Sequence, residues 1–369
     1  MIKYIGSKRT LMPVILDAVR LAGGARTVVD LFSGTSRVGH ALKGAGYRVV
    51  SNDHNAYAHT LARCYVQADA EDVLADAGRL VREFNGMNGE PGYFTETFCE
   101  RSRYFQPKNG ARIDAIREAI ARKGLEPELE SVMLVSLMEA ADRVDSTTGL
   151  QMAYLKQWAP RAFNDLELRV PEVLPRSAHG KGEAHCMEAV EAARLLDGDV
   201  AYIDPPYNQP FVSGELPHLG VARSVGQARG VRGGVQARVD VRGRKSAFNS
   251  RPKFAGAMRE LLGAVQAPVL IVSFNNEGYL SLRDGSDAGR IVGRGGGRGD
   301  DDRERLQAVR GRRSGIQPRG GGGGWATCGT GVPVCGVARG PVGAARGGSL
   351  GRGGIRRGCT FERDRRRVA

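Results

Sequence analysis

Apolar residues in the first part of the chain alternate between helical spacing and short continuous runs. Helical spacing predicts amphipathic helices, and short apolar runs that end in glycine or polar residues are typical of buried parallel strands. The expected helices are Thr10–Ala22, Val38–Lys43, Asn55–Val66 and Ala70–Phe84, and the expected strands are Thr27–Phe32 and Tyr47–Ser51. This alternation of strand and helix predicts a doubly wound α/β sheet.

The alternation of expected strands and helices stops between residues 86 and 175, where Gly, Asn and Pro are frequent. In this stretch the pattern predicts two helices, Ala111–Lys123 and Pro127–Val144. Sheet character then returns in two expected strands, Asp199–Ile203 and Pro268–Phe274, with a helix over Arg251–Val265 between them. The pattern therefore predicts four parts: a first sheet part (1–85), a helical insertion (86–175), a second sheet part (176–281) and a tail (282–369).

The formal net charge of +14 over 369 residues favours a nucleic-acid partner, but its distribution weakens that inference. Residues 1–209 hold 25 basic and 28 acidic side chains, whereas residues 282–369 hold 19 Arg, 8 acidic side chains and 25 of the 52 Gly. Such a tail has too little apolar surface to fold, so we expect it to be disordered. An arginine–glycine tail that binds nucleic acid is the alternative, although its only aromatic residues are Trp325 and Phe361.

The sequence does not support a membrane-spanning, secreted, metal-binding or disulfide-containing protein. No apolar run is long enough to span a membrane, and the first residues lack the apolar stretch of a signal peptide. The six Cys are scattered without a Cys-x-x-Cys pair, so we expect neither a metal site nor a disulfide framework. These observations favour a cytoplasmic protein.

Two features at the predicted strand ends suggest a nucleoside site. Asp30-Leu31-Phe32-Ser33-Gly34-Thr35 ends the first strand, and Gly34 would let the backbone approach a ligand at the start of the next helix. Asp53 ends the second strand, where an acid can accept hydrogen bonds from a ribose diol. A cap for the following helix is the alternative role of Asp53.

A third motif, Asp204-Pro205-Pro206-Tyr207, follows the strand Asp199–Ile203. The two prolines end the strand in a rigid turn that holds an acid and an aromatic ring side by side. The acid can accept a hydrogen bond from an amino group, a proline-fixed carbonyl can accept another, and the ring can stack on a flat base.

With Lys3-Tyr4-Ile5-Gly6-Ser7-Lys8 at the start, these motifs give the sequence a resemblance to the Dam-like family of adenine-specific DNA methyltransferases. The resemblance implies a Rossmann-like methyltransferase sheet, S-adenosylmethionine as cofactor and double-stranded DNA with a flipped adenine as substrate. It also implies target recognition by the insertion, and it makes a restriction endonuclease a candidate partner. The implied cofactor-binding residues are Tyr4, Lys8, Asp30, Phe32, Gly34, Asp53 and Glu183, and the implied catalytic residues are Asp204, Pro205, Pro206 and Tyr207.

The residues also indicate the chemistry. The adenine amine is a poor nucleophile because its lone pair is delocalised into the ring. Hydrogen bonds to the Asp204 carboxylate and the Pro205 carbonyl would localise that lone pair for direct attack on the methyl group. Tyr207 would stack on the flipped base, which offsets part of the cost of unstacking it. One departure from the family is Ser36, which stands where a second glycine is usual.

Two segments of the insertion allow more than one interpretation. Arg101–Asn109 contains Arg, Lys, Gln and Asn, which read base edges or contact phosphate, but a solvated loop explains it equally well. Asp142–Ser146 is explained by an ion pair within a helix.

The pattern of helices and strands is lost over residues 210–238 and again after 281. We interpret both stretches as products of a shifted reading frame. Read one nucleotide later, a back-translation of Pro210–Ser224 encodes the aromatic residues expected after Asp-Pro-Pro-Tyr. On this hypothesis the chain as written lacks native sequence after its catalytic motif, and we expect poor folding or little activity.

Three other functions are weighed against DNA adenine methylation. A methyltransferase that acts on RNA or on another planar amine would use the same Asp-Pro-Pro-Tyr chemistry. A non-catalytic protein could bind nucleic acid through the basic tail. A nicotinamide dehydrogenase is disfavoured because the glycine turn lacks the full G-x-G-x-x-G pattern.

Overall fold

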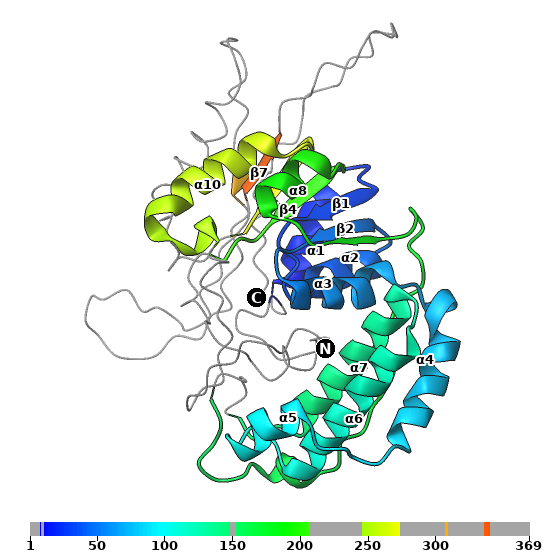
Figure 1. The fold of residues 1–369 in the computed structure, drawn as a ribbon. Coiled ribbons are helices and arrows are strands. Elements are labelled where there is room, and N and C mark those ends of the chain that lie inside the picture. Colours follow the sequence, from blue (N-terminus) through cyan, green and yellow to red (C-terminus); the bar gives the residue numbers. More distant parts are fainter. Residues whose placement is uncertain are drawn as a thin grey trace, which may run out of the picture.

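The computed structural model describes residues 8, 11–147, 153–206, 246–273, 307–308 and 336–339. Its strands are β1 (Thr27–Asp30), β2 (Arg48–Asn52), β3 (Glu183–His185), β4 (Val200–Ile203), β5 (Val269–Val272), β6 (Gln307–Ala308) and β7 (Gly336–Arg339). They form one sheet of order β3-β2-β1-β4-β5-β7-β6, in which β1 to β5 run parallel and β7 and β6 pair antiparallel at one edge (Figure 1). The strand order reverses between β1 and β4, the position at which open α/β sheets bind ligands.

Both faces of the sheet are covered, as the continuous apolar strands predict. Successive residues of a strand point to opposite faces, so Val28 packs with α1 (Met12–Leu21) and α2 (Arg37–Gly44). Val29, the next residue, packs on the other face with α8 (Ala189–Leu195) and α10 (Arg251–Ala264). The structure confirms the predicted doubly wound α/β sheet.

A second core lies in a layer of helices beside the sheet (Figure 1). Its elements are α3 (Ala56–Ala62), the π-helix η2 (Arg63–Gln67), α4 (Ala70–Asn85), α5 (Tyr93–Thr95), the π-helix η3 (Glu96–Glu100), α6 (Pro107–Lys123) and α7 (Pro127–Arg143). Val73 and Phe84 of α4 are buried in this core, so α4 packs with the predicted insertion although it lies before residue 86. At the junction with the sheet, the buried Lys43 ammonium lies 2.8 Å from the Asp69 carboxylate.

Several short elements carried too little pattern to be predicted. The strand β3 has only three residues, all half-buried, and α8 has seven. Two 3-10 turns, η4 (Pro160–Phe163) and η6 (Ala247–Asn249), complete the described elements. Residues 210–238 lie outside the described residues. Within the tail expected to be disordered, the structure describes the two short strands β6 and β7 and nothing else.

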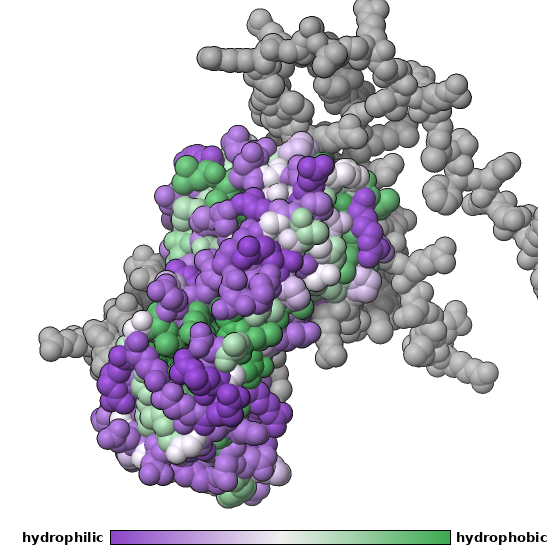
Figure 2. All heavy atoms as spheres, turned by 90° about the vertical axis from the view of Figure 1, so that its right-hand side faces the viewer, coloured by the Kyte–Doolittle hydropathy of each residue, from purple (hydrophilic) through white to green (hydrophobic). Residues whose placement is uncertain are grey.

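The described surface is mainly polar. Figure 2 shows one face in which hydrophilic residues predominate and hydrophobic residues form only small patches. None of the described helices is long and apolar enough to cross a membrane.

Candidate active site

Three carboxylates lie at the carboxyl edge of the sheet, each after one of three neighbouring parallel strands. Asp30 ends β1, Asp53 directly follows β2 and Asp204 directly follows β4. The strand register places Asp30 opposite Ser51 of β2 and Tyr202 of β4, so all three strands end near the same level. Acids far apart in the sequence therefore meet at the point where the strand order reverses.

Asp53 holds the glycine turn in place. One carboxylate oxygen accepts a hydrogen bond from the Gly34 N–H at 2.9 Å, and the other accepts one from the Asn55 N–H at 2.9 Å. The helix cap proposed as an alternative belongs instead to Asn55, whose side chain accepts from the Tyr57 N–H at 3.0 Å. Gly34 has a φ of +49°, which a glycine adopts without strain.

Asp30 is the unusual group of the site. Its side chain is 1% exposed, and neither carboxylate oxygen has a hydrogen-bond partner. Burial, and then the negative charges of Asp204 and Asp53, raises the pKa of Asp30 to about 8, while the nearby Phe32 N–H lowers it without reaching hydrogen-bond geometry. A buried carboxyl group without a partner is costly for folding, and such groups concentrate at functional sites.

Lys8 reaches the site from outside the sheet. Its ammonium lies 2.8 Å from a carboxylate oxygen of Asp204 and donates a hydrogen bond of 3.3 Å to Ser273 Oγ. Ser273 directly follows β5 and donates its backbone N–H to the Ile203 carbonyl at 2.9 Å. Lys8 therefore joins the start of the chain to the ends of β4 and β5.

An aromatic wall lies next to the glycine turn. The Phe32 ring meets the buried Phe248 ring edge to face at a centroid distance of 5.1 Å. Nearby, the Asn52 side chain donates to the Met187 carbonyl and accepts from the Met187 N–H. No pattern in the sequence identified Phe248 as a wall residue, because Phe32 and Phe248 lie far apart in the chain.

Comparison with known proteins decides the family. The family profile described as D12 class N6 adenine-specific DNA methyltransferase matches residues 4–212, more than half of the chain. The chain belongs to this family. The match confirms the predicted family.

Named relatives agree with this assignment. Modification methylase StsI of Streptococcus sanguinis is 29% identical over 299 residues, which cover 76% of this chain and 45% of StsI. Type II methyltransferase M.NlaIII of Neisseria lactamica is 26% identical over 291 residues, covering 76% of this chain and 85% of the relative. Type II methyltransferase M.FokI of Planomicrobium okeanokoites is 28% identical over 298 residues, covering 75% and 45%. The chain thus spans less than half the length of StsI and M.FokI.

Of the residues predicted for this D12 methyltransferase site, the structure brings together Lys8, Asp30, Phe32, Gly34, Asp53 and Asp204, the last followed by Pro205 and Pro206. Tyr4 and Tyr207 lie outside the described residues. Among the described residues, no group of three or more His, Cys, Asp or Glu could hold a metal ion.

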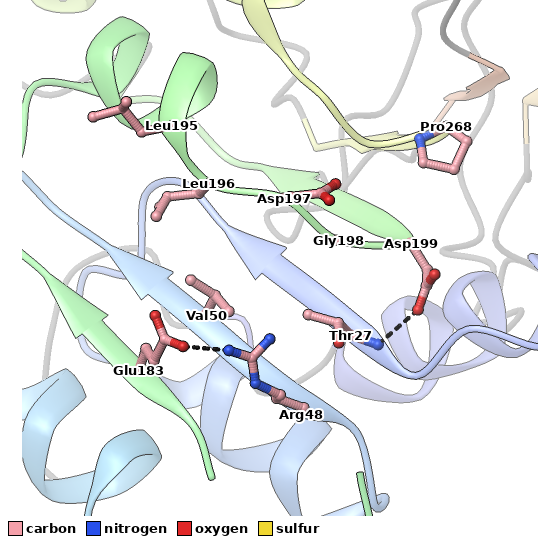
Figure 3. A pocket seen from close by; sticks show the side chains of 10 residues that line it. All are labelled: Thr27, Arg48, Val50, Glu183, Leu195, Leu196, Asp197, Gly198, Asp199 and Pro268. Atoms are coloured by element: carbon pink, nitrogen blue, oxygen red, sulfur yellow. Dashed lines mark hydrogen bonds and ion pairs between the residues drawn. The ribbon is translucent and has the colours of Figure 1, made fainter. Parts of the chain in front are cut away.

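Glu183 does not join the other predicted residues of the methyltransferase site. It opens β3 level with Val50, forms an ion pair with Arg48, and lines an open pocket of about 500 Å³ (Figure 3). That pocket also contains Thr27 and Asp199, which precede or begin their strands, so it lies at the amino edge of the sheet. Glu183 lies at this edge because it begins β3, and the acid on the carboxyl side of β3 is Glu188, which caps α8.

The structure also separates the roles of Arg101–Asn109 in the methyltransferase. Asn109 is buried and bonds the backbone of Ala162, Asn164 and Leu166, so its side chain supports the fold. Arg103 is exposed, and its guanidinium lies 4.9 Å from the centroid of the Trp158 ring. The Arg103 side chain is therefore on the surface, whereas the Asn109 side chain is used by the fold.

The second ambiguous segment is a clamp between two loops. The buried Asp145 carboxylate pairs with Arg161 at 2.6 Å and accepts a hydrogen bond from the Thr147 hydroxyl at 2.7 Å. This ion pair crosses from the end of α7 to η4. The Asp145–Arg161 ion pair fixes the segment just before η4, which contains Trp158.

Proposed function

We propose that this chain transfers a methyl group from S-adenosylmethionine to the exocyclic amine of adenine at specific sites in double-stranded DNA. The observation that carries the proposal is the buried, unpartnered carboxyl group of Asp30 beside Asp204 and its two prolines. An acid that needs a cationic partner and an acid that can accept from an amine stand together at the ligand-binding edge of the sheet.

The residues present fit the cofactor. Asp30 lacks a partner, and the ammonium group of an amino acid would supply one. Gly34 leaves its side of the turn open because no Cβ is present, and the Phe32 ring offers an apolar surface beside it. Asp53 would accept from the ribose hydroxyls with the lone pairs left by its two backbone bonds. Bound S-adenosylmethionine supplies an electrophilic methyl group.

Asp204 and Pro205 would prepare the adenine amine. Lys8 pairs with one carboxylate oxygen of Asp204 and holds the carboxylate in place, and that carboxylate would accept a hydrogen bond from the amine. The Pro205 carbonyl would accept a hydrogen bond from the second N–H of the amine, and the two hydrogen bonds draw the nitrogen lone pair out of conjugation with the ring. Positioning of this kind supplies much of the rate in a displacement that needs no covalent enzyme intermediate. Tyr207 stacks on the flipped base.

The helical insertion, residues 86–175, would recognise the target sequence. Arg103 over Trp158 presents a cation and a ring together on its surface. Lys156 is exposed next to this pair, and its carbonyl accepts a hydrogen bond of 2.6 Å from Arg103. Stacked arginine and exposed lysine are suited to phosphate and base contacts.

Glu188, rather than Glu183, would lie beside the cofactor, because it follows the carboxyl end of β3.

A methylation assay with labelled S-adenosylmethionine tests the function. The purified chain is incubated with duplex DNA or with RNA, and the labelled base is identified by mass spectrometry. We expect N6-methyladenine in DNA and a loss of at least about a hundredfold in Asp204→Ala, because the amine acceptor is gone. Asp197→Ala, an exposed acid before the same strand at the opposite edge, is the matched control and should retain activity. Label in RNA alone would favour the RNA methyltransferase, and equal activity of Asp204→Ala would refute the site.

A restriction endonuclease is the proposed functional partner. Relatives are named modification methylases or Type II methyltransferases. DNA from cells that express the chain should resist a Type II endonuclease that cuts at the sequence the chain methylates. Unchanged digestion of fully methylated DNA would contradict the partnership but would leave the proposed methyl transfer to adenine unaffected.

A further inference from the structure

Ser36 has a backbone conformation that serine rarely adopts. Its φ of 57° and ψ of 18° lie in the left-handed region, and it is the single non-glycine residue of positive φ in the part of the chain that the structure describes. Glycine adopts this region freely, whereas a side chain there is strained. Strained residues of this kind cluster at ligand-binding sites.

The Ser36 hydroxyl adds a second energetic cost to folding, because it is buried without a hydrogen-bond partner. The residue is 0% exposed, and its Oγ has no hydrogen-bond partner. Although Ser36 precedes α2, its side chain makes no capping hydrogen bond to that helix. The backbone N–H instead donates to the Ser33 carbonyl at 2.7 Å, and the Ser36 carbonyl accepts from the His40 N–H at 2.8 Å. The hydroxyl is therefore unused by the fold.

Ser36 does not stand alone. Ser33 Oγ and both carboxylate oxygens of Asp30 are also buried and without partners. Three of the seven residues from Asp30 to Ser36 thus hold buried polar atoms that nothing in the described structure satisfies. Because buried polar groups are almost always hydrogen-bonded in native proteins, such a cluster indicates a missing ligand.

We propose that the Ser36 hydroxyl, with that of Ser33, is a direct hydrogen-bonding group for the amino-acid end of S-adenosylmethionine. This inference rests on the proposed function and adds to it a contact made by a side chain where glycine is usual in the family. The amino-acid end is the part of the cofactor that carries both an ammonium group to pair with the Asp30 carboxylate and a carboxylate that can accept from two hydroxyls. The hydroxyl then offsets its strain only when the cofactor is bound.

Ser51 provides a matched control inside the same structure. Its Oγ is also buried and without a partner, so Ser51→Ala removes the same kind of group. The Ser51 hydroxyl faces α2, since a Cβ placed on Gly39 would lie 3.1 Å from it. It therefore lies between sheet and helix, on the strand beside Asp30 and not in the glycine turn itself.

The experiment measures the dissociation constants of two ligands from the full chain, and the melting temperature of each variant of the chain. S-adenosylhomocysteine carries the amino-acid end, and methylthioadenosine lacks it. We expect Ser36→Ala and Ser36→Gly to weaken S-adenosylhomocysteine binding roughly two- to tenfold, as for one lost neutral hydrogen bond, without weakening methylthioadenosine binding. Neither variant should melt at a lower temperature than the parent, and Ser51→Ala should bind both ligands as the parent does.

Two results would overturn the inference. One is unchanged S-adenosylhomocysteine affinity in both Ser36 variants, which would leave the hydroxyl as a structural cost alone. The other is an equal loss of both ligands together with a lower melting temperature, which would indicate damage to the turn. If the parent chain itself bound neither S-adenosylmethionine nor S-adenosylhomocysteine, the proposed function would fail first, and the inference with it.

Discussion

Lys8 and Asp204 form an ion pair of 2.8 Å across the carboxyl edge of the sheet, although 195 positions of the sequence separate them. Both side chains are largely buried, with exposed fractions of 17% and 18%. A pair of limited exposure holds its geometry better than a surface pair, because fewer water molecules compete with it. Lys8 therefore fixes the orientation of the acid that we propose as the acceptor for the adenine amine.

Lys8→Gln should lower the rate of methylation by about tenfold or more, since the Asp204 carboxylate loses the cation that orients it. Single-turnover assays with saturating DNA and cofactor measure this rate. Lys8→Arg, which keeps the charge, should recover part of it. Lys253→Gln removes an exposed lysine of α10 and should have no effect. A normal rate in Lys8→Gln would show that the pair is not needed.

Asp30 should make stability depend on pH. The carboxyl group loses its proton near pH 4 in the unfolded chain and near pH 8 in the folded chain. Between these values the folded state holds more protons, so the free energy of unfolding falls as pH rises. Asp30→Asn should therefore melt at a higher temperature than the parent at pH 8, and the gap should close toward pH 5.

The same Asp30→Asn variant should bind S-adenosylmethionine more weakly, because a neutral amide cannot pair with its ammonium group. Thermal melts across the pH range and isothermal titration of the cofactor measure the two effects. A variant less stable than the parent at pH 8 would contradict the raised pKa. Tight cofactor binding by that variant would exclude Asp30 as the ammonium partner.

Arg103→Ala and Trp158→Ala should weaken DNA binding roughly five- to twentyfold and leave cofactor affinity unchanged. Each change removes one member of the pair formed by the exposed Arg103 and the half-buried Trp158 ring. For Arg103→Ala, the dependence of affinity on salt should also fall by about one unit, as for one lost phosphate contact. Arg79→Ala, an exposed arginine of α4, is the control. Equal DNA affinity in all three variants would place target recognition elsewhere.

The reading-frame hypothesis predicts a difference between two genes. A frame-corrected gene, restored over residues 210–238 and after 281, should yield a protein with a higher melting temperature and faster methylation than the chain as written. The family match ends at residue 212, close to where the helical and strand pattern is lost. Resequencing the gene is the direct test. A verified frame through both stretches, or equal activity of the two proteins, would refute the hypothesis.

Much of the sheet could be predicted because each long element carries its own pattern. The apolar runs before Asp30 and Asp204 predicted β1 and β4. The turn residues at the ends of these strands then located two of the three clustered acids. Asp53 followed for the same reason. The three-residue β3 carried no such pattern, so the sequence could not show that Glu183 begins this strand and that Glu188 follows its carboxyl end.

By itself, the sequence determined the order of the elements, the acids at three strand ends and the family, because these depend on short-range pattern and spacing. Only the tertiary structure decided which atoms meet. It paired Lys8 with Asp204, gave the cap of α3 to Asn55 and left Asp30 and Ser36 buried without partners. Burial and partnership depend on packing between segments far apart in the chain, and no local pattern encodes them.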